Sequence, residues 1–233
     1  MINKAMILAA GFGKRIHPLT LKNPKPLLKI GKETLLYNTL KFLELYGIKE
    51  VVINVHYLKD QIIEYINKNQ FDLSIKIVEE KDKILGTGGG VLNAIQNFSN
   101  LPFLVINPDT IWSSKYLPEL KLMEKIFLEN TKNKCLLLVV NKKKSFDLTF
   151  KGDFNLKNGL ISRKINSQHI YTGLQIIKPE AFLNSDMEIF SMNKIWDKLI
   201  SKQELCGIES KIEFLHVSTL DIYKKLIKEK FKY

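Results

Sequence analysis

The sequence has little that would suit an exported or membrane-bound protein. Only two cysteines occur among its 233 residues, and because Cys135 and Cys206 each stand beside aliphatic residues, we expect buried free thiols rather than a disulfide or a metal pair. The apolar run at residues 5–10 is too short for a signal-peptide core or a bilayer span. No tract rich in proline, serine or glycine marks a linker. We therefore expect a cytoplasmic protein with no membrane association, folded as one continuous domain.

Acidic residues are scarce relative to basic ones, which leaves a formal charge of +12. A basic surface attracts nucleic acid, anionic membranes or phosphorylated substrates, but the excess here is mostly lysine spread along the chain. Near the end of the chain apolar residues recur at helical spacing while lysines take the other positions, which is typical of a solvated amphipathic helix. The apolar positions are Leu220, Tyr223, Ile227 and Phe231. Because zinc-finger and helix-turn-helix spacings are absent, and no aromatic residues interleave with the basic ones, we expect no nucleic-acid partner.

Strand-like and helix-like segments alternate through the first half of the chain. Short apolar runs are followed by amphipathic segments, and Gly47 is placed to end the first helix. The expected strands cover residues 5–10, 51–55, 73–78 and 103–107, and the expected helices cover residues 34–46, 58–66 and 88–98. Because parallel strands need helical crossovers, this order predicts an α/β, Rossmann-like fold. We expect a mixed, mostly parallel central sheet with helices on both faces.

The second half of the chain is less regular. We expect strands at residues 135–140 and 170–177, a polar hairpin within 146–165, and a helix at 191–200. Ligands of such folds bind at the carboxyl ends of the strands. This half is therefore expected to cover that end of the sheet and to complete a substrate pocket.

A short glycine loop follows the first strand. Gly11 and Gly13 allow tight turns and close approach of backbone N–H groups to phosphate oxygens, while Lys14 and Arg15 add charge-assisted contacts. The loop lacks the third glycine of a dinucleotide fingerprint and the spacing of a P-loop, and a glycine pair can serve a purely structural turn. Further on, Lys25 stands between two prolines that restrict its backbone. A rigidly mounted cation suits phosphate recognition, and an ordinary exposed lysine in a proline-rich loop is the alternative.

Taken together, these motifs resemble the signature of the sugar-1-phosphate nucleotidylyltransferases. The matching segments are LAAGFGKR at 8–15, PLT at 18–20, PKPL at 24–27, LGTGGG at 85–90, NPD at 107–109, YTG at 171–173 and FLHVST at 214–219. Within that family the chain is most similar to the short N-acetylmuramate-1-phosphate uridylyltransferases of bacterial cell-wall recycling. The segments that carry this similarity are NVHY at 54–57, the triple glycine at 88–90, NPDTIW at 107–112 and FSMN at 190–193. Mannose-1-phosphate guanylyltransferases remain the alternative.

The resemblance implies an enzyme that joins a nucleoside triphosphate, with UTP favoured, to a sugar 1-phosphate and releases pyrophosphate. It implies the nucleotide-diphospho-sugar transferase fold in one domain of residues 1–233, as a monomer or homodimer, with a nucleotide-binding half at 1–112 and a sugar-binding half at 113–233. A sugar 1-phosphate is already ionised near neutral pH, so positioning and charge neutralisation replace a general base. A non-catalytic nucleotide-binding homologue is less favoured, because it would be expected to have lost at least one of the catalytic residues.

The resemblance also assigns roles to individual residues. Arg15, Lys25 and Asp109 are the expected catalytic residues, with Lys25 at the α-phosphate and Asp109 holding Mg²⁺, although an isolated aspartate at this place would more often cap a helix. The nucleotide is expected to contact Ala9, Ala10, Gly11, Gly13, Lys14, Glu80, Gly86, Thr87 and Gly88. The sugar is expected to contact Asn107, Trp112, Thr172, Gly173 and Asn193. Trp112 and Tyr171 are equally compatible with a place in the core.

Three positions depart from the family pattern. His216 stands where many relatives carry an aspartate as a second metal ligand, and Ser218 stands where they carry glycine. Because a neutral imidazole is a poor ligand for Mg²⁺, we expect the metal to depend on Asp109 and phosphate oxygens alone, or to bind through water. Gly86 replaces a residue that is commonly acidic in the close relatives, which would alter the preference for base or sugar.

Overall fold

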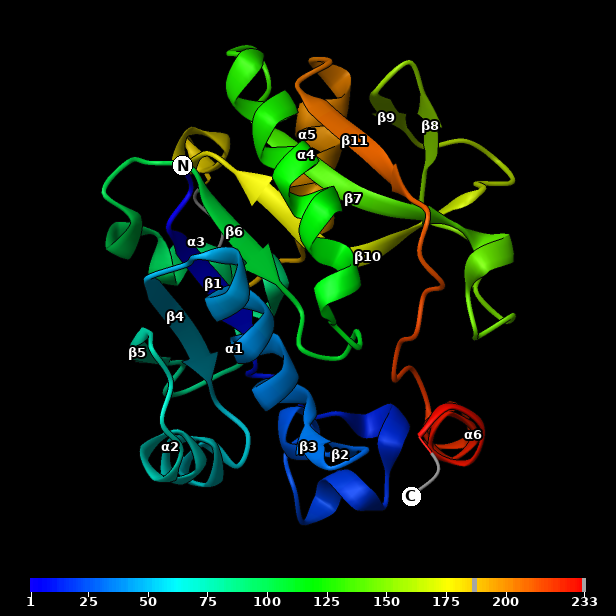
Figure 1. The fold of residues 1–233 in the computed structure, drawn as a ribbon. Helices are drawn as coiled ribbons and strands as arrows, with labels where there is room; N and C mark the ends of the chain where they lie inside the picture. The colour runs from blue at the N-terminus through cyan, green and yellow to red at the C-terminus, as the bar shows by residue number, and fades with distance from the viewer. Residues whose placement is uncertain (186–187, 232–233) are drawn as a thin grey trace.

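The computed structural model describes residues 1–185 and 188–231. Its strands are β1 (Lys4–Leu8), β2 (Lys29–Ile30), β3 (Glu33–Thr34), β4 (Glu50–Val55), β5 (Ser74–Glu79), β6 (Phe103–Ile106), β7 (Cys135–Asn141), β8 (Asn155–Lys157), β9 (Leu160–Ser162), β10 (His169–Ile177) and β11 (Leu205–Ser210). In this part of the chain a nine-stranded sheet has the order β5-β4-β1-β6-β10-β7-β11-β9-β8 (Figure 1). β10 runs antiparallel to β6 and β7, whereas β4, β1 and β6 are parallel neighbours and β7 is parallel to β11. The predicted mixed, mostly parallel sheet is confirmed.

Helices cover both faces of this sheet. Side chains of a strand alternate between its two sides, so consecutive apolar residues make both faces apolar, and both need a covering layer. The helices are α1 (Leu35–Tyr46), α2 (Lys59–Lys68), α3 (Gly86–Ala94), α4 (Leu117–Glu129), α5 (Met192–Ser201) and α6 (Leu220–Lys230). Ala5 and Ile7 of β1 belong to the core that packs under α1, α2 and α4, whereas Met6 between them belongs to the core under α3 and α5. Figure 1 shows α1 and α4 in front of the sheet and α5 behind it.

The first helix and the first strand show how local chemistry sets the bounds of the elements. Thr34 caps α1 by accepting a hydrogen bond from the Tyr37 N–H at 3.0 Å, and Gly47 ends the helix with φ 105°. The predicted helix at 34–46 is therefore confirmed. β1 ends at Leu8, two residues before the predicted end, because the Ala9 N–H donates to the Asn54 side chain instead of continuing the strand ladder.

The second half of the chain does more than cover the end of the sheet. β10 pairs with β6, which would otherwise be the edge of the first half, and β7, β11, β9 and β8 extend the sheet from there. The predicted hairpin is confirmed as β8 and β9, which are joined through Asn158 and Gly159 at φ 50° and 78°. One sheet thus contains strands from residues 1–112 and from residues 113–233.

A smaller core joins the two ends of the described chain. Ile222 and Leu226 of α6 pack against Ile16 and Leu28 of the N-terminal loops, and the predicted apolar face of α6 packs on the same cluster. The hydroxyl group of Tyr223 donates to the carbonyl of Lys29 at 2.8 Å. Helix α6 therefore supports the segment that follows β1.

None of the helices in the described ranges has the length and apolar character needed to cross a bilayer.

Candidate active site

A cavity of about 440 Å³ opens at the carboxyl ends of the parallel strands β1, β4, β5 and β6. This is the edge of an α/β sheet at which ligands bind. Twelve of the predicted site residues line it: Ala9, Ala10, Gly11, Gly13, Lys14, Arg15, Lys25, Glu80, Gly86, Thr87, Asn107 and Asp109. The residues predicted to be catalytic therefore share one cavity with most of the residues predicted to bind the nucleotide.

The glycine loop forms one wall of the cavity, and its two glycines have different surroundings. Gly13 has φ 64°, and a Cβ atom there would lie 3.0 Å from Cγ2 of Thr20 and 3.3 Å from Cβ of Lys25. The Thr20 hydroxyl donates to the Gly13 carbonyl at 2.9 Å, which ties the loop to the following segment. A Cβ atom on Gly11 would meet no protein atom within 4 Å. Protein packing therefore demands a glycine at position 13, whereas position 11 faces open space in the cavity wall.

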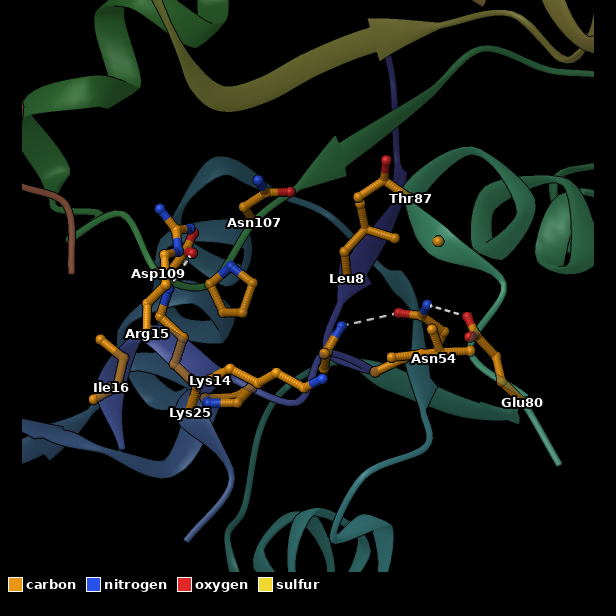
Figure 2. A pocket seen from close by; sticks show the side chains of 18 of the residues that line it. Leu8, Lys14, Arg15, Ile16, Lys25, Asn54, Glu80, Thr87, Asn107 and Asp109 are labelled. Carbon is orange, nitrogen blue, oxygen red and sulfur yellow. Dashed lines mark hydrogen bonds and ion pairs between the residues drawn. The ribbon is translucent and has the colours of Figure 1, made fainter. Parts of the chain in front are cut away.

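Two oppositely charged side chains meet at one end of the cavity. The Lys25 ammonium lies 2.5 Å from Oδ2 of Asp109, and Arg15 lines the same cavity (Figure 2). His216 approaches from the other side, with its Nε2 3.2 Å from the same oxygen. The segment that carries His216 is held by backbone hydrogen bonds to the residues around Asp109, including Val217 N–H to the Asp109 carbonyl at 2.8 Å.

The electrostatics of this corner favour an ionised Asp109. Burial alone would raise the pKa of this carboxyl group, but the charges of Lys25 and His216 outweigh burial and hold the pKa well below its usual range. Both neighbours bind Oδ2, while the buried Oδ1 accepts no hydrogen bond within the described residues. An unpartnered carboxylate oxygen of this kind fits a hard divalent cation. No group of three or more acidic, histidine or cysteine side chains gathers for metal binding in residues 1–185 and 188–231, so the remaining ligands would have to come from phosphate oxygens or water.

The opposite end of the cavity is held by hydrogen bonds between uncharged donors and one carboxylate. Asn54 accepts from the Ala9 N–H at 2.9 Å and donates to Oε1 of Glu80 at 2.6 Å. Oε2 of Glu80 accepts from the Leu85 N–H at 2.7 Å. Both side chains line the cavity, and Figure 2 shows them across from Lys25 and Asp109. We refer to Ala9, Asn54, Glu80 and Leu85 as the Asn54 brace.

The third wall is the start of α3, where Gly88 packs against a later segment of the chain. The Gly88 and Gly89 N–H groups donate to the Phe190 carbonyl at 2.9 and 3.1 Å, and a Cβ atom on Gly88 would lie 2.4 Å from the Phe190 ring. Gly88 therefore lets the segment before α5 pack on α3, and it does not line the cavity. Gly86 and Thr87 do line it, and they belong to the first turn of α3, where N–H groups have no partner within the helix.

Trp112, one of the predicted sugar contacts, is packed in the core, which is the alternative that the sequence left open. Its ring is 3 % exposed and stacks on Phe42 with centroids 5.6 Å apart. Its Nε1–H donates to the Asn107 carbonyl at 2.8 Å. The indole therefore supports Asn107 from behind, and it does not face the cavity.

The other predicted sugar contacts also lie outside the cavity lining. Thr172 is buried, and its hydroxyl donates to the Leu138 carbonyl at 2.8 Å. Gly173 has φ 92°, and a Cβ atom there would lie 2.9 Å from Cβ of Asn107, so this glycine makes room for Asn107. Asn193 is exposed in the first turn of α5 and accepts from Nη2 of Arg163 at 2.5 Å. Of the five predicted sugar contacts, Asn107 alone lines the cavity as the described residues form it.

Two polar cavity residues were not predicted as site residues. Asn54 is the only polar side chain in the buried part of β4, and a lone amide in an apolar strand is the signal that would have found it. Ser218 was noted only as a departure from the family pattern. Its hydroxyl donates to Oδ2 of Asp147 at 2.5 Å, a contact between segments far apart in the sequence that no local pattern reveals.

Residues 4–146 match the family described as nucleotidyl transferase. The chain belongs to this family. The resemblance to sugar-1-phosphate nucleotidylyltransferases that the sequence indicated is thereby confirmed, and the protein is an enzyme of this class. This nucleotidyl transferase is 29 % identical over 220 residues to the N-acetylmuramate alpha-1-phosphate uridylyltransferase of Caulobacter vibrioides, and the alignment covers 91 % of this chain and 90 % of the relative. A probable mannose-1-phosphate guanylyltransferase of rice, Oryza sativa, is 35 % identical over 112 residues, which are 46 % of this chain and 31 % of the relative.

Solved structures confirm the fold of this nucleotidyl transferase. HddC from Yersinia pseudotuberculosis superimposes with a TM-score of 0.78 at 21 % identity, over 99 % of this chain and all of the other, and it has also been solved in complex with GMP-PN. A putative glucose-1-phosphate thymidylyltransferase from Bacillus anthracis has a TM-score of 0.78 at 18 % identity, over 99 % of this chain and 96 % of the other. At such identities the likeness establishes the architecture, which is the Rossmann-like fold that the sequence predicted.

Proposed function

We propose that this nucleotidyl transferase transfers UMP from UTP to N-acetylmuramate 1-phosphate, and that it serves peptidoglycan recycling in the cytoplasm. The observation that carries the proposal is that the Lys25–Asp109 ion pair and Arg15 line one cavity. The choice of substrates is supported by the relative from Caulobacter vibrioides, which aligns over nearly the full length of both chains.

The proposed chemistry needs two cations and a carboxylate, and it needs no catalytic base. A phosphate oxygen of the sugar 1-phosphate forms a bond to the α-phosphorus of UTP. The bond from that phosphorus to the bridging oxygen breaks, and pyrophosphate leaves with the bonding electron pair. Lys25 and Arg15 lie where they would neutralise the charge that is shared between the attacking and leaving oxygens.

We further propose that the enzyme depends on Mg²⁺. Asp109 would hold the ion through its unpartnered Oδ1, because Oδ2 is already bound by Lys25 and His216. When bound, the ion would supply positive charge between phosphate oxygens and help to orient them. Lys25 and His216 would keep the carboxylate ionised and fixed in place.

A panel of substrates tests the proposal. Pyrophosphate release is measured with UTP, GTP, dTTP and CTP, each combined with N-acetylmuramate, N-acetylglucosamine, glucose and mannose 1-phosphates, with Mg²⁺ and with excess chelator. We expect the highest kcat/KM for UTP with N-acetylmuramate 1-phosphate, and loss of activity with chelator. Absence of pyrophosphate release for every pair would contradict the proposed reaction.

A mannose-1-phosphate guanylyltransferase is the second candidate. It is favoured by one observation, which is that proteins of that name align with about half of this chain at 33 to 35 % identity. The panel separates the two candidates, because a higher kcat/KM for GTP with mannose 1-phosphate would replace the first proposal by the second.

A further inference from the structure

The Asn54 brace is a buried polar structure inside an apolar setting. Asn54 is 2 % and Glu80 is 3 % exposed, while the neighbouring Ile53 and Val55 are fully buried. Burial of an amide and a carboxylate is costly unless both find hydrogen-bond partners. Here both carboxylate oxygens of Glu80 and both polar atoms of the Asn54 amide have a partner. An arrangement that is fully paired has a defined geometry.

The orientation of the Asn54 amide follows from its two partners. Its oxygen faces the N–H of Ala9, which only donates, and its nitrogen faces Oε1 of Glu80, which accepts. Rotating the amide by half a turn would place donor against donor and oxygen against oxygen. Asparagine is suited to this position because it accepts on one side and donates on the other within a short side chain. Aspartate cannot donate in its ionised form, and leucine can do neither.

The last glycine of the LGTGGG motif gives independent support to the brace. A Cβ atom on Gly90 would lie 2.7 Å from Nδ2 of Asn54 and 2.8 Å from Oε1 of Glu80. The backbone of α3 therefore packs directly on the Asn54–Glu80 pair, and any side chain at position 90 would displace it. Asn54 thus connects the start of the glycine loop, the turn after β5 and the helix that carries Gly86 and Thr87.

We propose that Asn54 is a positioning residue that sets the base selectivity of the enzyme by fixing the Glu80 carboxylate as a hydrogen-bond acceptor. The inference rests on the proposed function, because it takes the base to lie at this end of the cavity. A fixed acceptor favours a base with a ring N–H, as in uracil, thymine and guanine. The corresponding ring nitrogen of cytosine or adenine is itself an acceptor, so its lone pair faces the carboxylate without a proton between them, which disfavours binding.

A reciprocal exchange of the two side chains tests the inference. In N54D two carboxylates face each other, so the brace is broken. In the double variant N54D/E80Q the new amide at position 80 donates to the new carboxylate at position 54, and its carbonyl accepts from the Leu85 N–H, so every hydrogen bond of the brace is restored. The group that faces the base is then an amide, which offers a donor as well as an acceptor. The exposed Asn3 provides the matched control, N3D.

The readout is nucleotide affinity measured by titration calorimetry with Mg²⁺ and without sugar phosphate. The wild type is expected to bind UTP at least about 10-fold more tightly than CTP, which corresponds to one well-placed hydrogen bond at a tenfold change per 1.4 kcal/mol. N54D should weaken UTP binding about 10-fold or more and reduce the UTP-to-CTP ratio. N54D/E80Q should recover the melting temperature of the wild type and keep the reduced ratio, and N3D should match the wild type in both.

Two results would overturn the inference. One is an equal loss of UTP and CTP affinity in N54D, because a merely structural role lowers stability without changing the ratio. The other is an unchanged ratio in N54D/E80Q. Nucleotide binding is measured apart from turnover, so a wild type that binds UTP selectively but releases no pyrophosphate would contradict the proposed function and leave the role of Asn54 supported. A wild type that binds no nucleotide would contradict both.

Discussion

The two ends of the cavity are built from different interactions. At one end Lys25 and His216 contact the carboxylate of Asp109, one oxygen of which is left without a hydrogen bond in the described part of the chain. At the other end the Glu80 carboxylate has each of its oxygens bound by an uncharged donor. The first end is charged and has a carboxylate oxygen free to bind a further ligand. At the second end every carboxylate oxygen is hydrogen-bonded, so its side chains have a fixed geometry.

This difference indicates that one end of the cavity affects the rate of the reaction and the other affects nucleotide binding. Cations next to phosphate groups interact more strongly with the transition state, in which negative charge moves between the attacking and leaving oxygens, than with the bound substrate. Such cations therefore lower the barrier of the reaction. A fully paired brace makes the same contacts throughout, so it affects which nucleotide binds. Substitutions at the charged end should therefore lower kcat, and substitutions in the walls around the brace should raise the KM for the nucleotide.

The largest expected effect is that of Lys25→Ala. In the proposed reaction, removing this ammonium group would leave the developing charge at the α-phosphate without one of its protein cations, and loss of a comparable electrostatic contact costs about 10²- to 10³-fold in kcat. Steady-state pyrophosphate release measures the change, and Lys22→Ala, at an exposed lysine of the same loop, is the control. A kcat of Lys25→Ala close to that of the wild type would contradict the view that the charged end of the cavity determines the rate.

A smaller effect is expected for Asp109→Asn. The amide keeps an acceptor for Lys25 and His216, but it loses the charge that favours a divalent cation. We expect about a 10²-fold lower kcat at millimolar Mg²⁺ with partial recovery at higher concentration, by analogy with the loss of one electrostatic group. The Mg²⁺ concentration for half-maximal activity is the measurement, with the exposed Asp82→Asn as control. An unchanged Mg²⁺ dependence would contradict the assignment of Asp109 as a metal ligand.

The smallest effect is expected for Gly11→Ala. This substitution tests whether the glycine leaves room for a ligand or serves the packing of the protein. Because a Cβ atom at this position meets no protein atom within 4 Å, the melting temperature should stay within about 2 °C of the wild type. The added methyl group points into the space of the glycine loop, so the KM for UTP should rise several-fold while kcat changes little. Thermal unfolding and steady-state kinetics measure the two quantities. A loss of stability without a change in KM would show that Gly11 serves the fold alone.

The parts of the site that the sequence predicts are those encoded by short motifs. Gly13, Lys25 and Asp109 follow strands or sit between prolines, so their neighbours in the sequence already indicate where they lie. Trp112 and Gly88 could not be assigned in this way. The Trp112 indole stacks on Phe42, and Gly88 packs against Phe190, which are both far away in the sequence. No local sequence pattern distinguishes a residue with such a packing contact from a residue that contacts a ligand.

The fold was predictable to a similar extent and for a similar reason. The alternating strands and helices of the first half follow from periodicity, but α4 and β11 were not predicted. Helix α4 has Pro118 in its first turn, where proline is tolerated, although in a sequence a proline reads as a break. β11 includes Gly207, against which the side chain of Ile161 packs from β9, so its stability as a strand comes from a neighbour in the sheet.

The packing of helix α6 on the N-terminal loops has a consequence for when the enzyme becomes active during synthesis. The glycine loop leaves the ribosome long before Ile222 and Leu226, which support it, and before His216, which contacts Asp109. A nascent chain can pair its early strands well ahead of that point. The contacts of His216 and α6 form only when residues 214–230 have emerged, so we expect no activity while this segment is still inside the ribosome.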